Sequence, residues 1–368
     1  MSSQPFSTLT LRVRITLIPH CSFFLPGRKE PELDSNHTDN LPHPKPSRGA
    51  FWSELSDSEK TALNRRSWIR ATLLFSLTLL STFLVGAGMV TSSPSSPLDF
   101  LRGWVFAVPL MGILLLHESG HYIAARRHKV AVSPPYFIPF PNLIGTMGAF
   151  ISIRSPIRSR KVLLDIGAAG PLAGFLPSII ALALGYHFST TGPMVTDMIV
   201  IEFGDSILTW LIQYAVIGPL PEGVSVWIHP AGLAGWVGLF VTMLNLLPIG
   251  QLDGGHIAFA LFGRRQWIVA PIMLTTLIFL GLTVSSWWWW LLGFLVVIYL
   301  VSIVAVRLIY KVKVPLSGLW RGELIRHPNT PDEEELDQRR CIIGWICVAV
   351  LILCFIPMPL NVLNLPVA

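Results

Sequence analysis

The stretch HESGH, residues 117–121, places two histidines and a glutamate inside one apolar segment. On an α-helix, His117 and His121 lie about 40° apart on one face, so both imidazoles can reach a single metal ion. Glu118 lies beside them and can take a proton from a water that the ion activates. This H-E-x-x-H spacing is typical of zinc hydrolases, although the ligand types also suit iron or manganese. The alternative is that the histidines are buried polar residues that neighbouring helices satisfy.

A catalytic zinc site needs a third protein ligand, and two aspartates are candidates. Arg127 occupies the position of the third histidine of a metzincin, and Glu202, the next glutamate, falls on the opposite side of the membrane in the topology predicted below. Asp165 begins an apolar segment, where an acid also favours the helix dipole. Asp253 lies within NLLPIGQLDGGH, residues 245–256, where proline and glycines break the helix. Irregular backbone at membrane depth is tolerated where it lines a cavity, so Asp253 is predicted to be the third ligand.

The composition is that of a membrane protein. Hydrophobic residues make up 52% of the 368 residues and charged residues 13%, compared with about 25% charged residues in soluble domains. Several apolar stretches approach or exceed the length of about 20 residues that a bilayer crossing requires. They are 70–90, 104–125, 163–187, 230–249, 267–284, 286–307 and 341–358. The predicted fold is therefore an all-α polytopic membrane protein with about seven transmembrane helices.

The distribution of basic residues predicts the orientation. If the N-terminal tail is cytoplasmic and the spans alternate, every one of the 27 Lys and Arg residues except Arg102 lies on the cytoplasmic side. Residues 198–218 are also apolar, but a full crossing there would place the later basic loops outside. They are therefore predicted to form an outer-side re-entrant or surface amphipathic helix. The net charge of +6 follows from this topology, so nucleic acid is not expected as a partner.

Residues 136–153, YFIPFPNLIGTMGAFISI, contain too many prolines and glycines for a helix. We predict a membrane-associated β-hairpin beside the metal site, whose edge pairs with an unwound substrate segment. Gly145, Thr146 and Gly148 of this hairpin are predicted to contact the substrate. The alternative is a simple amphipathic cover over the basic loop.

The chain is predicted to divide into four parts. Residues 1–66, rich in Pro, Ser and Asn, form a disordered cytoplasmic tail, and residues 67–310 form the transmembrane core. Residues 311–340 form a cytoplasmic loop, and residues 341–368 contain a C-terminal transmembrane helix. Three alternatives stay open for the tail: a regulatory segment, a targeting sequence, or the product of a misplaced start codon.

Two motifs together resemble those of the site-2 protease family of intramembrane zinc metalloproteases, peptidase family M50. HESGH fits the family's H-E-x-x-H, and NLLPIGQLDGG, residues 245–255, fits its N-x-x-P-x-x-x-L-D-G pattern. The resemblance covers residues 104–310. Within it, residues 145–174 are similar to the branch that includes plant chloroplast and cyanobacterial members.

The resemblance implies one zinc ion on His117, His121 and Asp253, with Glu118 as the base. It also implies cleavage of a transmembrane protein substrate within the lipid bilayer, in regulated intramembrane proteolysis, after an upstream site-1-type protease has trimmed that substrate. Asn245 is expected to orient the substrate or the oxyanion, or alternatively to cap the broken backbone nearby. The expected location is a bacterial inner membrane with a cytoplasmic N-terminus, and a chloroplast membrane is the alternative.

Two other functions fit the same residues. A metal-ion transporter would use them as a transit site, but it should carry polar groups through several spans, and the last three predicted spans are nearly free of ionisable groups. A catalytically inactive family member would act as a membrane scaffold, but it would have no need of Glu118 as a base. The sequence therefore favours a zinc-dependent intramembrane metalloendopeptidase.

Overall fold

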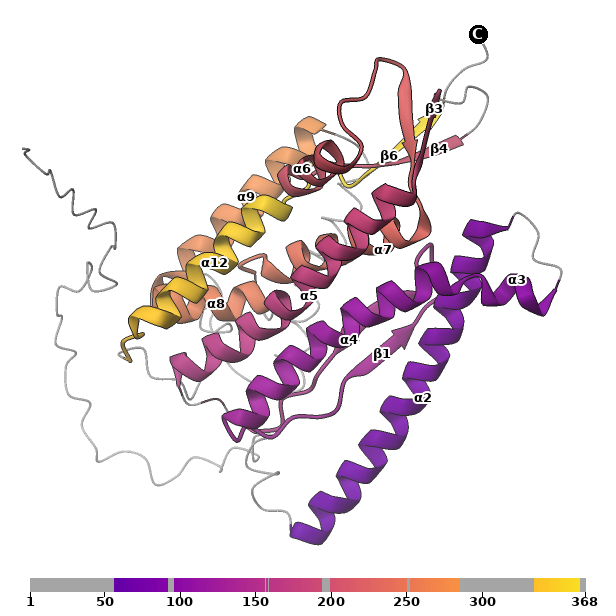
Figure 1. The fold of residues 1–368 in the computed structure, drawn as a ribbon. Coiled ribbons are helices and arrows are strands. Elements are labelled where there is room, and N and C mark those ends of the chain that lie inside the picture. Colours follow the sequence, from indigo (N-terminus) through magenta and orange to yellow (C-terminus); the bar gives the residue numbers. More distant parts are fainter. Residues whose placement is uncertain are drawn as a thin grey trace, which may run out of the picture. The chain divides into compact units, whose positions relative to one another are not determined.

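The computed structural model describes residues 56–91, 96–155, 157, 159–193, 199–249, 252–284 and 334–364. This part of the chain is mostly helical, with three small two-stranded sheets (Figure 1). The predicted span 286–307, most of the predicted loop 311–340 and residues 1–55 of the predicted tail lie outside the described residues.

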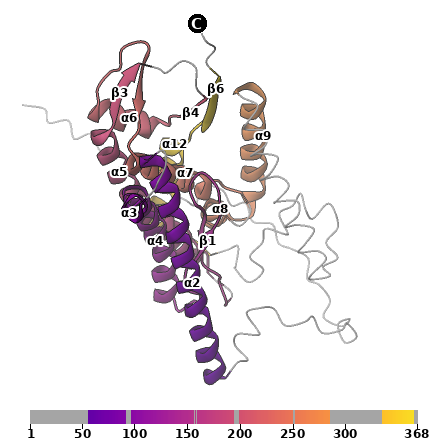
Figure 2. The ribbon, with the colours of Figure 1, turned by 90° about the vertical axis from the view of Figure 1, so that its right-hand side faces the viewer.

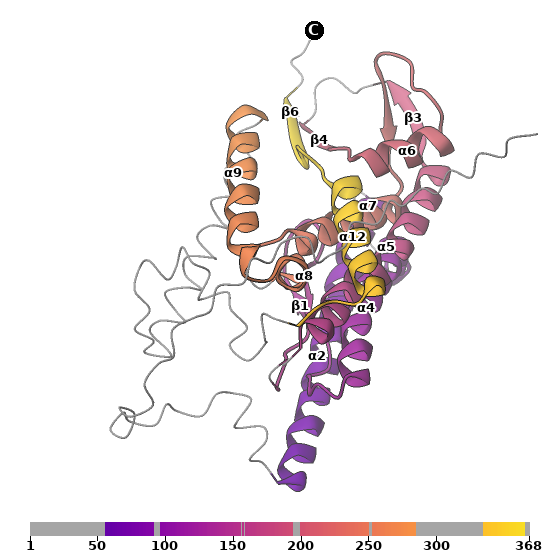
Figure 3. The ribbon, with the colours of Figure 1, turned by 90° about the vertical axis from the view of Figure 1, so that its left-hand side faces the viewer.

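Four helices surround the metal-binding motifs: α4 (Trp104–Arg127), α5 (Arg160–Phe188), α7 (Pro230–Leu246) and α8 (Asp253–Phe262). Two more pack against them, α2 (Asp57–Val90) on α4 and α12 (Gln338–Cys354) on α5 and α7. The other helical segments are α3 (Pro97–Leu101), α6 (Ile207–Val216), η1 (Gly263–Arg265) and α9 (Gln266–Val284). Figures 2 and 3 show α9 to one side of α4 and α5, where it contacts α8 and η1.

Three helical stretches of the described residues are long and apolar enough to cross a membrane. They are Lys60–Val90, Leu98–Arg127 and Arg160–Phe188, and they coincide with the first three predicted spans. Helix α7 is also apolar, but its 17 residues extend over about 26 Å, less than the hydrocarbon core of a bilayer. The structure supports a mostly helical membrane protein, and the number of seven spans stays a prediction.

Small residues let α4, α5 and α7 approach one another closely. A Cβ on Gly120 would lie 2.3 Å from the backbone oxygen of Ala169, and a Cβ on Gly235 would lie 2.3 Å from the backbone nitrogen of Leu182. Buried apolar side chains of the same helices form the main core. Close backbone approach through small residues is typical of helices that pack in membranes. Helix α5 therefore packs directly on the helix that carries HESGH.

The predicted hairpin region contains two paired strands. Strand β1 (Tyr136–Pro139) pairs antiparallel with β2 (Thr146–Phe150), with a register irregularity between Phe137 and Pro139. Strand β1 packs on α2, and β2 contacts α4. The pairing places β2 beside the helix of the metal ligands, and the membrane position of the hairpin stays a prediction.

The predicted outer-side helix over 198–218 is shorter than expected. Its first part is strand β4 (Ile199–Phe203), and α6 begins only after Ser206, whose hydroxyl oxygen accepts a hydrogen bond from the Thr209 N–H at 3.1 Å. This side-chain cap satisfies a backbone donor that has no partner within the helix, and so fixes where the helix starts.

The helix of the predicted C-terminal span, 341–358, ends four residues earlier than expected. Helix α12 ends at Cys354, because Pro357 and Pro359 cannot continue a helix. The chain then forms β6 (Leu360–Asn364), which pairs antiparallel with β4. A separate pair joins β3 (Thr190–Pro193) to β5 (Val224–Trp227). At the other end, α2 begins at Asp57, so residues 57–66 are helical and do not belong to a disordered tail.

The start of α5 is tied to the segment that precedes α12. The carboxylate of Glu334 accepts hydrogen bonds from the Ser159 hydroxyl and from the Arg160 N–H, both at 2.7 Å. Partial burial opposes ionisation, but these hydrogen bonds hold the pKa of Glu334 below its usual value. This anchored end of α5 fixes the helix that faces the metal-binding residues.

Candidate metal centre

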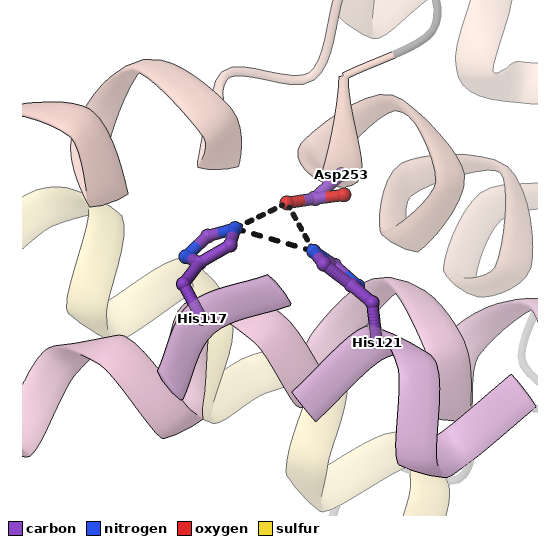
Figure 4. Close-up of side chains that lie close together, drawn as sticks. All are labelled: His117, His121 and Asp253. Carbon is purple, nitrogen blue, oxygen red and sulfur yellow. Dashed lines mark hydrogen bonds and ion pairs between the residues drawn. The ribbon is translucent and has the colours of Figure 1, made fainter. Parts of the chain in front are cut away.

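His117 and His121 project from α4 toward Asp253, the first residue of α8 (Figure 4). The Nε2 atoms of the two histidines lie 3.2 Å apart, and Asp253 Oδ2 lies 3.1 Å from His121 Nε2 and 3.4 Å from His117 Nε2. A tetrahedral zinc ion with bonds of about 2.0–2.2 Å separates its ligand atoms by about 3.4 Å. The spacing and donor types of this triad therefore fit zinc.

Asp165, the other aspartate that the sequence offers, lies in a different cluster. Its Oδ2 accepts a hydrogen bond from Arg340 Nη2 at 2.6 Å and lies 2.8 Å from His128 Nε2. Within the described ranges, the triad is the single group of three or more His, Cys, Asp or Glu side chains close enough to share an ion. Asp253 is therefore the carboxylate that joins the two histidines.

Helix α5 fixes both histidines. His121 Nδ1 lies 2.7 Å from the backbone oxygen of Ile166, so Nδ1 carries the proton and donates it, and Nε2 is left to bind a metal. Gly170 lies against the same ring, because a Cβ there would be 2.0 Å from His121 Nε2. A Cβ on Gly174 would be 3.2 Å from the Cβ of His117. The glycines of α5 thus leave room for both imidazoles.

The crossing of α7 and α8 brings Asp253 to the histidines. Helix α7 ends at Leu246, just before Pro248, and α8 begins at Asp253. A Cβ on Gly254 would lie 1.9 Å from the backbone oxygen of Leu246, so only glycine allows the two helix ends to cross this closely. The helix break predicted from NLLPIGQLDGG is therefore present in the structure.

Two further predicted site residues lie beside the triad. Glu118 is buried at 5% exposure, and its carboxylate interacts with the backbone N–H of Ile151. Asn245 Nδ2 lies 3.3 Å from His117 Nε2. Both side chains line the cavity that contains the triad. The arrangement combines a metal-ligand set, a carboxylate and an amide donor around one space.

Residues 105–283 match the model of the family described as Peptidase family M50. Over this segment, which is 179 of the 368 residues, the chain is similar to peptidase family M50. The M50 segment carries all of His117, Glu118, His121, Asn245 and Asp253.

The curated relatives have names of the same kind. The chain is 39% identical over 182 residues to "Probable zinc metalloprotease EGY1, chloroplastic" of Arabidopsis thaliana, covering 48% of this chain and 33% of that protein. It is 32% identical over 278 residues to the protein of the same name from Oryza sativa subsp. japonica, covering 69% and 47%. It is 30% identical over 242 residues to "Probable zinc metallopeptidase EGY3, chloroplastic" of Arabidopsis thaliana, covering 61% and 41%.

The chain thus spans between a third and about a half of the length of these relatives. Their names confirm the resemblance to the branch with plant chloroplast members. They give no support to the expected bacterial inner membrane and agree with the alternative, a chloroplast membrane.

The cavity of the M50 segment has a volume of about 250 Å³ and includes residues that the sequence analysis missed. His256 lies one turn after Asp253 on α8, and Ala149, Phe150 and Ile151 come from β2 and the residue after it. The spacing of His256 from Asp253 could have predicted a shared helix face. The strand residues could not be found in this way, because their position depends on how β2 packs against α4.

The structure does not bring Gly145, Thr146 or Gly148 to the lining of this cavity. Thr146 is buried, and its hydroxyl donates a hydrogen bond to the backbone oxygen of Ile138 at 2.9 Å. Gly145 and Gly148 have φ angles of 76° and 100°, which favour glycine. These residues shape the hairpin, and their contact with a substrate stays a prediction.

Gly170→Ala in the M50 segment is expected to weaken zinc binding by about 10- to 100-fold, the usual effect of disturbing the groups that orient a metal ligand. The added Cβ would displace the His121 ring. Gly112→Ala on α4 is the matched control, because a Cβ there meets no atom within 4 Å. Titration of the purified proteins with a zinc-competing chelator measures both affinities. Equal zinc affinities in the two variants would contradict the role of Gly170.

Proposed function

We propose that the protein is a zinc-dependent intramembrane endopeptidase that cuts transmembrane segments of membrane-protein substrates. The observation that carries the proposal is the triad of His117, His121 and Asp253 with Glu118 in the same cavity. Three protein ligands with room for a further one characterise catalytic zinc sites, whereas structural zinc sites have four protein ligands. The match to the Peptidase family M50 model and the relatives named as zinc metalloproteases support the same activity.

The residues of the cavity have distinct roles in this proposal. Zinc, when bound, lowers the pKa of water and polarises the carbonyl group of the peptide bond. His117 Nε2, His121 Nε2 and Asp253 Oδ2 would hold the ion. The carboxylate of Glu118 accepts a proton from the attacking water and then delivers it to the nitrogen of the leaving amine. The amide N–H of Asn245 donates a hydrogen bond to the oxyanion.

The position of the triad along α4 supports access for water. His121 lies five residues before Arg126, which is about 8 Å along the helix. Arg126 and Arg127 form the last turn of α4 and mark the cytoplasmic membrane edge in the predicted topology. In this topology the buried histidines lie only a short distance from the cytoplasmic edge.

The substrate and setting are part of the proposal. We assign catalysis to the predicted core, residues 67–310, acting on a membrane protein that an upstream protease has trimmed. The names of the relatives favour a chloroplast membrane. Comparing the wild type with Glu118→Gln on a labelled single-span substrate tests the activity.

The hairpin is proposed to hold the unwound substrate by β-augmentation. Strand β2 pairs with β1 along one edge, and Ala149 and Phe150 of this strand line the cavity. A peptide added to the other edge would run past the metal centre. A peptide bond inside a helix is shielded by the hydrogen bonds of that helix, so an extended substrate is required before cleavage.

Ala149→Pro is expected to lower cleavage at least about tenfold and to leave zinc bound, because proline removes a backbone N–H from β2 and fixes φ. Ala149→Val retains the N–H and is the control. Cleavage of the single-span substrate and zinc content are measured for both variants. Full activity of Ala149→Pro would count against binding by the strand.

A further inference from the structure

The cavity of the metal centre has an apolar end that the proposed chemistry does not use. This end is lined by Ile153, Ile157, Leu163 and Ile166. Leu163 is 1% exposed, Ile166 is 5% exposed and Ile157 is 6% exposed. Ile157, Leu163 and Ile166 belong to an apolar cluster that is separate from the main core. Ile153 packs against this cluster. The walls of the apolar end are therefore fixed by packing.

Backbone contacts of Ile166, in this apolar end, and of Ile151, two residues before Ile153, lie against the reacting groups. The oxygen of Ile166 accepts the hydrogen bond from His121 Nδ1 at 2.7 Å, and the N–H of Ile151 interacts with the carboxylate of Glu118. Leu163 lies one turn before Ile166 on α5. A peptide whose carbonyl group lies at the triad can direct a neighbouring side chain into the apolar end.

The lining determines which side chain fits. None of Ile153, Ile157, Leu163 or Ile166 can pair with a charge, so a charged side chain buried there would lose its hydration without compensation. The whole cavity measures about 250 Å³, below the range of about 300–1,000 Å³ for pockets that bind drug-sized ligands. Part of this volume adjoins the triad, Glu118 and Asn245. The remainder suits one side chain of moderate size.

We propose that the apolar end is a subsite for one branched aliphatic side chain next to the peptide bond that is cut, and that Leu163 and Ile157 set its size. This inference rests on the proposed endopeptidase activity. Leu163 closes the subsite from α5, and Ile157 closes it from the segment before α5. Both side chains are held in place by their neighbours in the apolar cluster.

The test compares Leu163→Ala with Leu164→Ala in the zinc-loaded full chain. Leu164 is the matched control, because it is 0% exposed, belongs to the main core and does not line the cavity. Mass spectrometry first locates the cut in a single-span substrate. Substrates with Ala, Leu, Phe or Asp at the residues flanking the cut are then compared by kcat/KM.

The wild type is expected to prefer Leu over Ala and Phe by at least about tenfold, and to reject Asp. Leu163→Ala is expected to raise the kcat/KM ratio of Phe to Leu at least about tenfold, because it enlarges the subsite. Leu164→Ala should leave this ratio unchanged. The milder Leu163→Val should move the ratio in the same direction and covers the case in which Leu163→Ala does not fold.

Binding of peptide hydroxamates gives a readout that does not depend on turnover. Affinity for a compound with a benzyl group, relative to one with an isobutyl group, should rise in both Leu163 variants. Unchanged ratios in cleavage and in binding, with an active wild type, would overturn the subsite and leave the proposed activity intact. A wild type that cuts no substrate would instead overturn the proposed activity.

Discussion

Glu118→Gln is expected to lower cleavage of a single-span substrate by about 10²- to 10⁴-fold, the usual contribution of a general base, while zinc stays bound. Glutamine has nearly the same size, and its side-chain oxygen can still face the Ile151 N–H. It cannot take up a proton from water. Glu118 is not part of the triad, so His117, His121 and Asp253 keep their positions.

The measurement needs zinc content and cleavage from the same preparation. If Glu118→Gln binds as much zinc as the wild type but does not cleave the substrate, the protein is an enzyme and not a metal-ion transporter. In a transporter, Glu118 would have no proton to transfer. It also excludes a scaffold role, which requires no base. Cleavage by Glu118→Gln at the rate of the wild type would contradict the proposed mechanism.

Asp253→Ala is expected to abolish cleavage by removing the ion. Loss of a direct ligand should weaken zinc binding by more than the roughly 10- to 100-fold that loss of an outer partner costs. Two histidines would remain, and their Nε2 atoms, 3.2 Å apart, cannot complete the site without the carboxylate.

Asp165→Asn is the control for this substitution. Asp165 binds Arg340 and His128 outside the cavity, so its neutralisation should disturb the ends of α5 and α12 and leave zinc affinity unchanged. Competition with a chelator measures both variants. Loss of zinc from Asp165→Asn, with zinc retained by Asp253→Ala, would reverse the assignment of the third ligand.

The positions of the metal-binding residues could be predicted from the sequence because local rules determine them. The i, i+4 spacing of His117 and His121 fixes their common face on α4. The proline and glycines of NLLPIGQLDGG, residues 245–255, predict the helix break that separates α7 from α8. These features need no knowledge of how distant segments pack.

The shorter outer helix could not be predicted in the same way. Hydropathy shows that 198–218 is apolar. It cannot show the cap at Ser206 or the pairing of β4 with β6. The earlier end of the C-terminal helix could be predicted, because Pro357 and Pro359 are visible in the sequence. They fall at the end of an apolar run whose length suggested a full crossing.

The walls of the cavity depend on tertiary packing. Leu163 and Leu164 are adjacent, apolar and equally buried, yet one lines the cavity and the other belongs to the main core. Periodicity shows that the two side chains point in different directions, but it does not show which side faces the metal. The contact of His121 with Ile166 decides this.

The most direct measurement of the central claim is the position and zinc dependence of the cut. The purified protein is reconstituted in liposomes with a single-span substrate, and the products are identified by mass spectrometry. We predict a cut within the membrane-spanning segment that stops on zinc chelation, returns with added zinc and is absent with Glu118→Gln. Cuts confined to the soluble flanks of the substrate, or a cut within the span that persists without zinc, would contradict the proposal.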